Sequence, residues 1–325
     1  MKTRHAVLLP LFLFLCTQFA PTVTMGADYP EKPIRVLVGL GAGGVADLSL
    51  RALLRTAEKY IKQPMIVINK PGASQSIALS ELVASAPDGY TIAMATDGYK
   101  ALTIHQQKLR FDPKAIRMLL GYARYRHVLF VRGDSPYAKY EDFVSLGKTN
   151  PAAMTYGGPG EGTAPDLIGK VFFRDLNIRP TYVPFKGSNE YVVAIMGGHL
   201  LSGIADISGV AKEAQAGTLK LVVAFGDKRL KEFPDVPSSK EKGHSDINLL
   251  NANLGVALHR DTPADRVKFL HDAFKKAVDD PEFKKAADSL GLQPLYTSPQ
   301  AVEEGILNAE RIGVPLLKQL NLFVE

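Results

Sequence analysis

The stretch VLVGLGAGGVADLSLRALLR, residues 36–55, joins a strand-like apolar run to a helical pattern through a glycine-rich turn. Its glycines at positions 39, 41 and 44 follow the G-x-G-x-x-G spacing that is typical of dinucleotide-binding loops. Such a loop needs an acidic residue at the end of the next strand to hold the ribose hydroxyls. The next strand-like run, MIVINK, ends in Asn69 and Lys70 instead. The sequence therefore argues against a nucleotide and for another use of the same turn.

Short β-branched runs alternate with helical patterns along most of the chain. The runs IRVLVGL, MIVINK and TIAMAT predict strands, and residues 46–61 and 74–85 predict the helices between them. After HVLFVRGDSP the alternation begins again, with strands in MTYGGP, TYVPF, LLSGIADI and LKLVVAFG and helices near residues 164–176, 188–197 and 210–216. This alternation predicts two α/β units, each with a parallel sheet and helices on both faces.

Two connecting segments are expected between these units, near residues 127–132 and 254–260, and the second of them, LGVALHR, is strand-like. The region after Arg260 is helical, and we expect it to pack on the first unit without strands of its own. Two lobes joined by two crossovers describe a hinged clamshell with a ligand cleft between the lobes. The expected domains are a signal peptide (1–27), lobe 1 (28–130 and 252–325) and lobe 2 (131–251).

The first 27 residues have the pattern of a secretory signal peptide. Lys2 and Arg4 precede an uncharged apolar run, residues 6–15, that is too short to span a bilayer. Cys16 is the only cysteine, and Leu15 before it is too large for the usual lipoprotein signal, so we expect no lipid anchor. The sequence predicts export to the periplasm, no disulfide and no stable membrane insertion.

Composition and motifs exclude several classes of function. Removing Lys2 and Arg4 with the signal peptide lowers the net charge from +6 to +4, and no basic run is interleaved with aromatic residues. Nucleic acid is therefore not an expected partner. Neither an H-E-x-x-H motif nor a G-x-S-x-G elbow occurs, so we expect no metal, no cofactor and no catalytic machinery. We expect a monomer that is not an enzyme.

A second glycine loop, in MTYGGPGEGTAPDLIGK, repeats the construction of the first. Each loop ends a predicted strand and leads into a helix, whose first amides and positive dipole end can hold an oxyanion without a charged side chain. Two such loops, one in each lobe, would face each other across the cleft. Either loop alone could be only a tight turn. The matched pair favours a function in binding a carboxylate.

The chain resembles the tripartite tricarboxylate transporter solute-binding proteins, the Bug family. The resemblance rests on segments that fall in the family's order from Tyr29 to the carboxyl end: YPEKPIRVLVGLGAGGVADLSLR, INKPGASQSIALSELVASAPDGYTIAMAT, YGGPGEGTAPDLIGKVF, VPFKGSNEYVVAIMGGHL and FPDVPSSKEKG. It implies an α/β, two-lobed periplasmic binding protein (type II) that presents a small organic carboxylate to a membrane permease. The alternative is a ligand-dependent sensor that docks on a membrane signalling protein.

The resemblance also implies where the ligand binds. The implied contacts in the first lobe are Leu40, Gly41, Ala42, Gly43 and Gly44. Those in the second lobe are Gly158, Pro159, Gly160, Glu161, Gly162 and Thr163, with Ser188 and Asp206 after later strands. The family commonly has Pro-Phe before the first loop and a hydroxyl residue before its Asp, whereas this chain has Gly39-Leu40 and Ala46. Glu161 adds an acid beside the anion site. These departures leave open a solute other than a simple dicarboxylate.

Four further side chains have competing interpretations. We expect Asp47 to stabilise the start of its own helix rather than contact the ligand. Asp206 could accept an ammonium group or cap the next helix with Ser208, and both remain open. Arg124 and Arg126 lie near the first connecting segment and could pair a carboxylate, but we expect them on the solvated surface.

Overall fold

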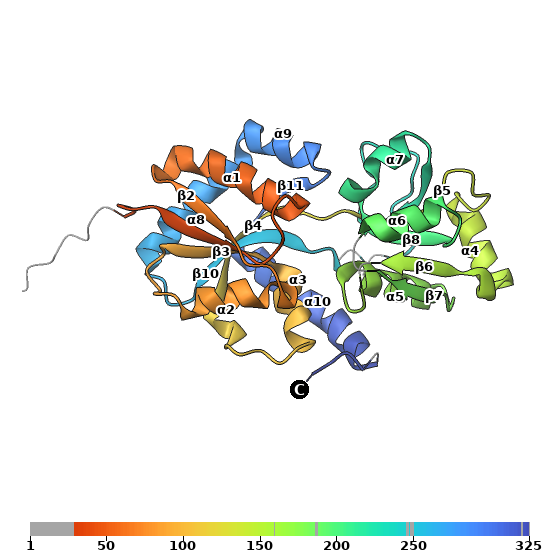
Figure 1. Cartoon of the computed structure of the whole chain (residues 1–325), viewed down its shortest axis with the longest axis horizontal. Helices are drawn as coiled ribbons and strands as arrows, with labels where there is room; N and C mark the ends of the chain where they lie inside the picture. Colours follow the sequence, from red (N-terminus) through yellow and green to blue (C-terminus); the bar gives the residue numbers. More distant parts are fainter. Residues whose placement is uncertain are drawn as a thin grey trace, which may run out of the picture.

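Two β-sheets, each flanked by helices, make up two units of the chain (Figure 1). The computed structural model describes residues 29–324, except 159, 186–187, 245–246, 248–249 and 320. The expected signal peptide, residues 1–27, lies outside these described residues. The predicted α/β class and two-lobed arrangement are confirmed.

The first sheet has six strands in the order β11-β4-β10-β3-β1-β2. Its strands are β1 (Ile34–Val38), β2 (Met65–Asn69), β3 (Thr91–Thr96), β4 (Ile116–Arg124), β10 (Asn253–His259) and β11 (Gln293–Thr297). β1 pairs in parallel with β2 and β3, whereas β10 is antiparallel to β3 and β4, and β11 is antiparallel to β4. The prediction of a parallel sheet is therefore wrong, and so is that of a C-terminal region without strands.

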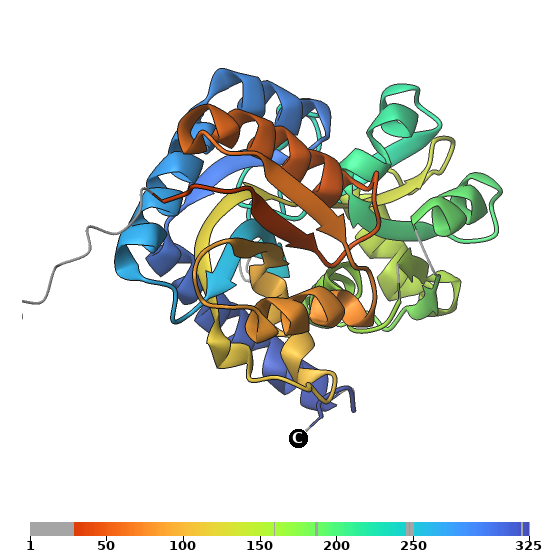
Figure 2. The same ribbon diagram turned by 60° about the vertical axis from the view of Figure 1, so that its left-hand side comes forward.

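Helices cover both faces of this sheet (Figures 1 and 2). One face carries α1 (Val45–Ile61), α8 (Ala264–Asp279) and α9 (Pro281–Ser289); the other carries α2 (Ser76–Ala84), α3 (Asp97–Ala101) and α10 (Pro299–Gln319). Because successive strand side chains point to opposite faces, Val36 packs in the core with Leu50 of α1, while Leu37 packs with Leu79 of α2. This burial on both sides explains the almost continuous apolar sequence of β1.

The second sheet has the order β7-β6-β8-β5-β9. Its strands are β5 (His127–Arg132), β6 (Thr155–Gly158), β7 (Thr181–Pro184), β8 (Ser202–Asp206) and β9 (Leu219–Ala224). β6 is parallel to β7 and β8, and β5 is antiparallel to β8 and β9, so this sheet is also mixed. One face carries α4 (Tyr140–Thr149) and α5 (Ala164–Asp175), and the other carries α6 (Ser188–Met196) and α7 (Ala211–Gln215).

The chain passes between the two sheets twice. The first passage is residues 125–126, between β4 and β5, and the second lies between the end of β9 and the start of β10. The expected connecting segments, residues 127–132 and 254–260, are instead occupied by β5 and β10, each of which pairs with a neighbour on both sides. The expected lobe boundary after residue 130 falls inside β5. Long-range pairing that local sequence does not reveal accounts for the difference.

None of the helices in the described region combines the length and the apolar character needed to cross a bilayer.

Candidate functional site

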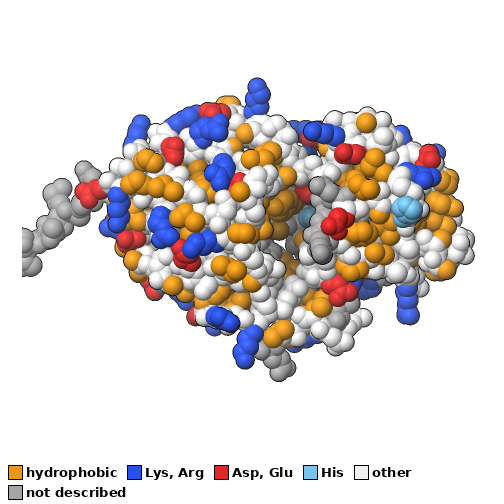
Figure 3. Space-filling model, in the orientation of Figure 1, with side chains coloured by type: hydrophobic (Ala, Val, Ile, Leu, Met, Phe, Trp, Pro, Cys, Tyr) orange, Lys and Arg blue, Asp and Glu red, His pale blue; other side chains and the backbone are white. Residues whose placement is uncertain are grey.

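A cleft with a volume of about 550 Å³ lies between the two units. Figure 3 shows the surface hollowed at this boundary. The first unit contributes residues that end or follow β1 and β3, including Leu40 and Thr96. The second unit contributes residues that follow β6 and end β8, including Thr163 and Asp206. The carboxyl ends of parallel strands are where open α/β sheets usually bind ligands, so the cleft is the candidate site.

The glycine loop of the first unit is held in place by Asp47. The Gly43 amide donates a hydrogen bond to Asp47 Oδ2 at 2.9 Å, and Arg51 Nε donates to the same oxygen at 2.9 Å. Asn69 Nδ2 donates to Asp47 Oδ1 at 2.9 Å. Gly43 has a φ of +79°, a conformation that glycine adopts without strain. Asp47 therefore orders the loop and the start of α1, which supports its expected structural role.

The glycine loop of the second unit repeats this arrangement. The Gly162 amide donates to Asp166 Oδ2 at 2.8 Å, and Lys170 Nζ donates to the same oxygen at 2.7 Å. Gly162 has a φ of +72°. Each loop thus pairs a left-handed glycine with an aspartate four residues later and a cation four residues beyond it. The amides of Gly43 and Gly162 are consequently engaged by their own loops.

The two aspartates differ in their ionisation. Burial acts to raise the pKa of Asp47, but hydrogen bonds from Arg51, Asn69 and Gly43 lower it below its usual value. Burial raises the pKa of Asp166, which is completely enclosed, and the bonds from Lys170 and Gly162 offset this only in part. Repulsion from Glu161 acts in the same direction as burial. The surroundings of Asp166 on the second loop are therefore less polar than those of Asp47 on the first.

Both loops present the start of a helix. Gly44 is the N-cap of α1 and Thr163 is the N-cap of α5, and in neither helix does a described side chain cap the first amides. The Thr163 hydroxyl donates instead to the Gly160 carbonyl at 2.8 Å. Uncapped amides at a helix start favour an anionic group.

The charge of the cleft wall is unusual for an anion site. Its acidic residues are Glu161 and Asp206, and none of the described residues that line it is a lysine or an arginine. A carboxylate in this cleft must therefore be held by backbone amides and neutral side chains.

The structure brings together only some of the implied ligand contacts. Leu40, Glu161, Gly162, Thr163 and Asp206 line the cleft. Gly41, Ala42, Gly43 and Gly44 are exposed on the first loop, Gly158 ends β6 and Gly160 lies on the second loop, but the described cleft wall does not include these six. Pro159 and the side chain of Ser188 lie outside the described residues; the backbone of Ser188 begins α6.

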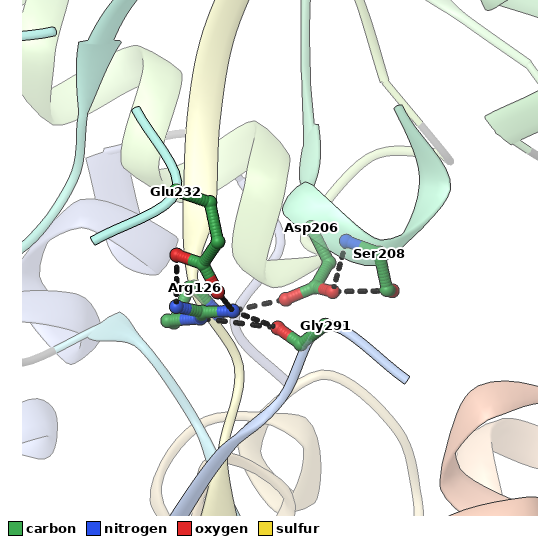
Figure 4. A network of polar contacts seen from close by, with 5 residues as sticks. All are labelled: Arg126, Asp206, Ser208, Glu232 and Gly291. Atoms are coloured by element: carbon green, nitrogen blue, oxygen red, sulfur yellow. Dashed lines mark hydrogen bonds and ion pairs between the residues drawn. The ribbon is translucent and has the colours of Figure 1, made fainter. Parts of the chain in front are cut away.

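Asp206 is engaged by its own unit. Its Oδ1 accepts hydrogen bonds from the amide and the hydroxyl of Ser208, at 2.9 and 2.5 Å, and its Oδ2 accepts from the Arg126 amide at 2.7 Å (Figure 4). Asp206 thereby caps the short helix at residues 207–209. Of the two interpretations that the sequence left open, the structure favours capping.

The expectation of solvated arginines is wrong for Arg126. Its guanidinium donates to the Gly291 carbonyl of the first unit, at 2.7 and 3.0 Å, and forms two hydrogen bonds of 3.1 Å with Glu232 of the second unit (Figure 4). The Arg126 side chain is only 16% exposed. Arg124 is half-buried and donates to Asn253. Arg126 therefore joins the two units beside the first passage between them.

Several cleft residues were missed by the sequence analysis. They include Gln75, Tyr99 and Gln106 from the first unit and Tyr125, His127 and Tyr191 from the second unit and its connection. Thr96 could have been found from its place as the last residue of the strand-like run TIAMAT, which forms β3. The others carry no local motif, because distant segments bring them together.

His127 is a buried, neutral group of the cleft wall. Burial lowers its pKa, and this effect outweighs the nearby Asp206 and a hydrogen bond with Asn251, which both raise it. The Asn251 amide nitrogen donates to the Phe225 carbonyl at 2.6 Å, which turns its Oδ1 toward His127 Nδ1, also at 2.6 Å. This orientation places the His127 proton on Nδ1.

Comparisons with known proteins agree with the geometry. Residues 50–322 match the model of the family described as tripartite tricarboxylate transporter family receptor. The UPF0065 protein in the gbd 5′ region of Cupriavidus necator is 33% identical over 304 residues, which cover 93% of this chain and 91% of that protein.

Two solved structures have the same fold. One, described as a periplasmic transporter, is 28% identical with a TM-score of 0.77, and the match covers 91% of this chain and 100% of the other. The other, R. palustris Rpa4515 with adipate, is 21% identical with a TM-score of 0.76 over 90% of this chain and 98% of the other. At that identity the second likeness shows the fold alone.

Proposed function

This chain belongs to the tripartite tricarboxylate transporter receptor family, whose members are receptors rather than enzymes. On that basis we propose which class of solute it binds and where the solute binds. We propose that it is a periplasmic receptor that binds a small organic carboxylate between its two units. It then delivers the solute to a permease of the tripartite tricarboxylate type. The signal-peptide pattern of residues 1–27 supports export.

The observation that carries this proposal is the pair of uncapped helix starts beside one cleft. α1 and α5 each begin at a loop fixed by an internal aspartate, and the cleft between them has a volume of about 550 Å³. That volume lies in the range of small-molecule sites. In our proposal, Leu40 and the loop around Gly41, Ala42, Gly43 and Gly44 contact the solute from the first unit. Glu161, Gly162 and Thr163 contact it from the second.

The proposed motion is a closure of one unit on the other. We place the two moving bodies at the two sheets with their helices and the hinge at residues 125–126. Support comes from the short passage between β4 and β5 and from the position of the cleft between the sheets. A solute that contacts both units stabilises the closed form by its differential affinity.

The chemistry of the two helix starts and a structurally similar protein both support a carboxylate as the solute. Backbone amides at a helix start form charge-assisted hydrogen bonds with a carboxylate, so no buried counter-charge is needed. The structurally similar Rpa4515 was solved with adipate. We therefore expect mono- or dicarboxylates of comparable size to bind.

The test is isothermal titration calorimetry of the mature protein with a panel of aliphatic and aromatic mono- and dicarboxylates. We expect at least one to bind with one site per chain. Thr163→Trp, which fills the cleft, should abolish that binding, whereas Thr149→Trp at the exposed end of α4 should not. Binding that survives Thr163→Trp, or a panel with no binder, would overturn the proposal.

A further inference from the structure

Gln75 is a buried polar side chain of the cleft wall whose hydrogen bonding is incomplete. It is 9% exposed, and its Nε2 donates to Thr96 Oγ1 at 3.3 Å. Its Oε1 is buried and finds no hydrogen-bond partner among the described residues. A buried polar atom without a partner is unfavourable, so a group that completes its hydrogen bonding would bind there preferentially.

The backbone that carries Gln75 is held in an unusual conformation. Ala73, Ser74 and Gln75 have φ values of +44°, +49° and +82°, although none of them is glycine. Residues with a side chain rarely adopt this left-handed region, and such strain clusters at ligand-binding segments. The conformation places Gln75 on the cleft wall at the foot of α2.

Gly39 makes room for this placement. A Cβ built on Gly39 would lie 2.6 Å from the Gln75 Cα and 2.7 Å from its Cβ, so only glycine fits at the end of β1. The first glycine of the G-x-G-x-x-G spacing thus serves the close approach of Gln75 rather than a phosphate. The first glycine loop and the strained segment form one wall of the site.

The neighbours of Gln75 define which group completes its hydrogen bonding. Gln75 Nε2 donates to Thr96 Oγ1, which also accepts from the Tyr99 amide at 3.1 Å, and the Gln75 atom without any partner is the acceptor Oε1. The last torsion of a glutamine side chain is soft, so the amide can turn Oε1 toward a group seated in the cleft in exchange for the long 3.3 Å bond from Nε2 to Thr96 Oγ1. The acids of the wall, Glu161 and Asp206, add further acceptors but no donor.

We propose that Gln75 is a specificity-determining residue of the cleft, whose Oε1 accepts a hydrogen bond from a hydroxyl or ammonium group of the solute. This inference rests on the proposed function and narrows it. The preferred solute is a carboxylate that also carries a donor, and an unsubstituted carboxylate leaves Gln75 unpartnered. A site built to bond a polar group rejects the analogue that lacks it, because its own polar atom is then left buried and unpaired.

The test compares ligands that differ only in the substituent at C2. Succinate, L-malate and L-aspartate form one series; glutarate, L-2-hydroxyglutarate and L-glutamate form a second. Titration calorimetry of the mature wild-type protein should give at least tenfold tighter binding for the hydroxyl or ammonium member of one series than for its unsubstituted member. The hydroxyl and ammonium arms show which donor Gln75 accepts.

Two variants test whether the Gln75 side chain causes the preference for the hydroxyl or ammonium ligand. Gln75→Leu keeps the approximate size and removes the amide, so the preference should fall below threefold. Gln75→Gly, which adopts a φ of +82° without strain, should fold even if Gln75→Leu does not, and should lose the preference in the same way. Gln300→Leu, at an exposed position of α10, is the control and should keep it.

The possible outcomes distinguish a failure of the inferred role of Gln75 from a failure of the proposed function. Equal binding of substituted and unsubstituted members, or an unchanged preference in both Gln75 variants, overturns the role of Gln75 and leaves the receptor intact. Failure of every carboxylate to bind overturns the proposed function as well.

Discussion

Gln106 Nε2 of the first unit donates a hydrogen bond of 3.1 Å to the carbonyl oxygen of Gly162 in the second unit. The bond crosses the cleft, because Gln106 follows α3 and Gly162 lies on the loop before α5. The Arg126 guanidinium bonds to Gly291 and Glu232 beside the passage at residues 125–126. These bonds tie the two units together on the cleft wall and at the proposed hinge.

The Gln106 bond should favour the closed form. Gln106→Ala removes one neutral hydrogen bond, worth about 0.5–1.5 kcal/mol, and should raise the solute Kd by roughly two- to tenfold. Small-angle scattering should show a larger radius of gyration for this variant at subsaturating solute. Gln215→Ala, at an exposed position of α7, should match the wild type. An unchanged Kd in Gln106→Ala would show that the bond is equally present in the open form.

The two left-handed glycines should respond differently to valine. Both positions resist a β-branched residue, at a cost of about 1–2 kcal/mol of folding free energy. A Cβ on Gly162 would lie 1.9 Å from Gln106 Oε1, whereas no described atom lies within 4 Å of one on Gly43. Gly162→Val should therefore break the bond to Gln106 and weaken solute binding more than Gly43→Val, as measured by calorimetry. Equal Kd values for the two variants would contradict a role for the bond between Gln106 and Gly162 in solute binding.

Arg126 should matter for stability. Arg126→Ala removes hydrogen bonds from a charged donor to the Gly291 carbonyl, and we expect a loss of roughly 1.5–3 kcal/mol in the free energy of unfolding measured in urea. The matched control is Arg132→Ala, since Arg132 and Asp134 form an exposed ion pair. Such pairs contribute only about 0–1 kcal/mol. Similar losses in the two variants would mean that the bonds at the hinge contribute little.

His127 should make the protein less stable in mild acid. Its pKa is lowered in the folded state from the ordinary value of 6.5, so below that pH the unfolded chain takes up a proton that the folded chain does not. The free energy of unfolding should then fall as the pH drops below 6.5, by at most about 1.4 kcal/mol per pH unit from this group. Urea titrations of wild type and His127→Gln between pH 7.5 and 5 measure the difference. Parallel curves for the two proteins would contradict the prediction, and the exposed His199→Gln serves as control.

The local pattern of the sequence predicted the parts of the fold that are set locally. Strand-to-helix turns at both glycine loops, and the structural role of Asp47, follow from residues within a few positions of one another. β4 escaped prediction because residues 118–123 of its sequence IRMLLGYAR form a short apolar run, which suits a buried helix as well as a strand. β11 is short and contains a proline, which weakens any strand signal.

Contacts between distant residues could not be predicted. Arg126 has the sequence character of a surface residue, but its partners Gly291 and Glu232 are 165 and 106 positions away. Gln75 stands on the cleft wall only because three residues without glycine's freedom adopt positive φ values. Such a conformation depends on the surrounding packing, and the local sequence does not predict it.

We place the solute between the two units, beside the starts of α1 and α5. The most direct measurement is a crystal structure of the mature protein with the carboxylate that binds most tightly in calorimetry. We predict density for the solute in the cleft between Leu40 and Thr163, with its carboxylate oxygens on backbone amides of at least one loop. Solute bound instead in the groove of about 500 Å³ on the second unit, where Arg229 and Lys242 supply cations, would contradict the account.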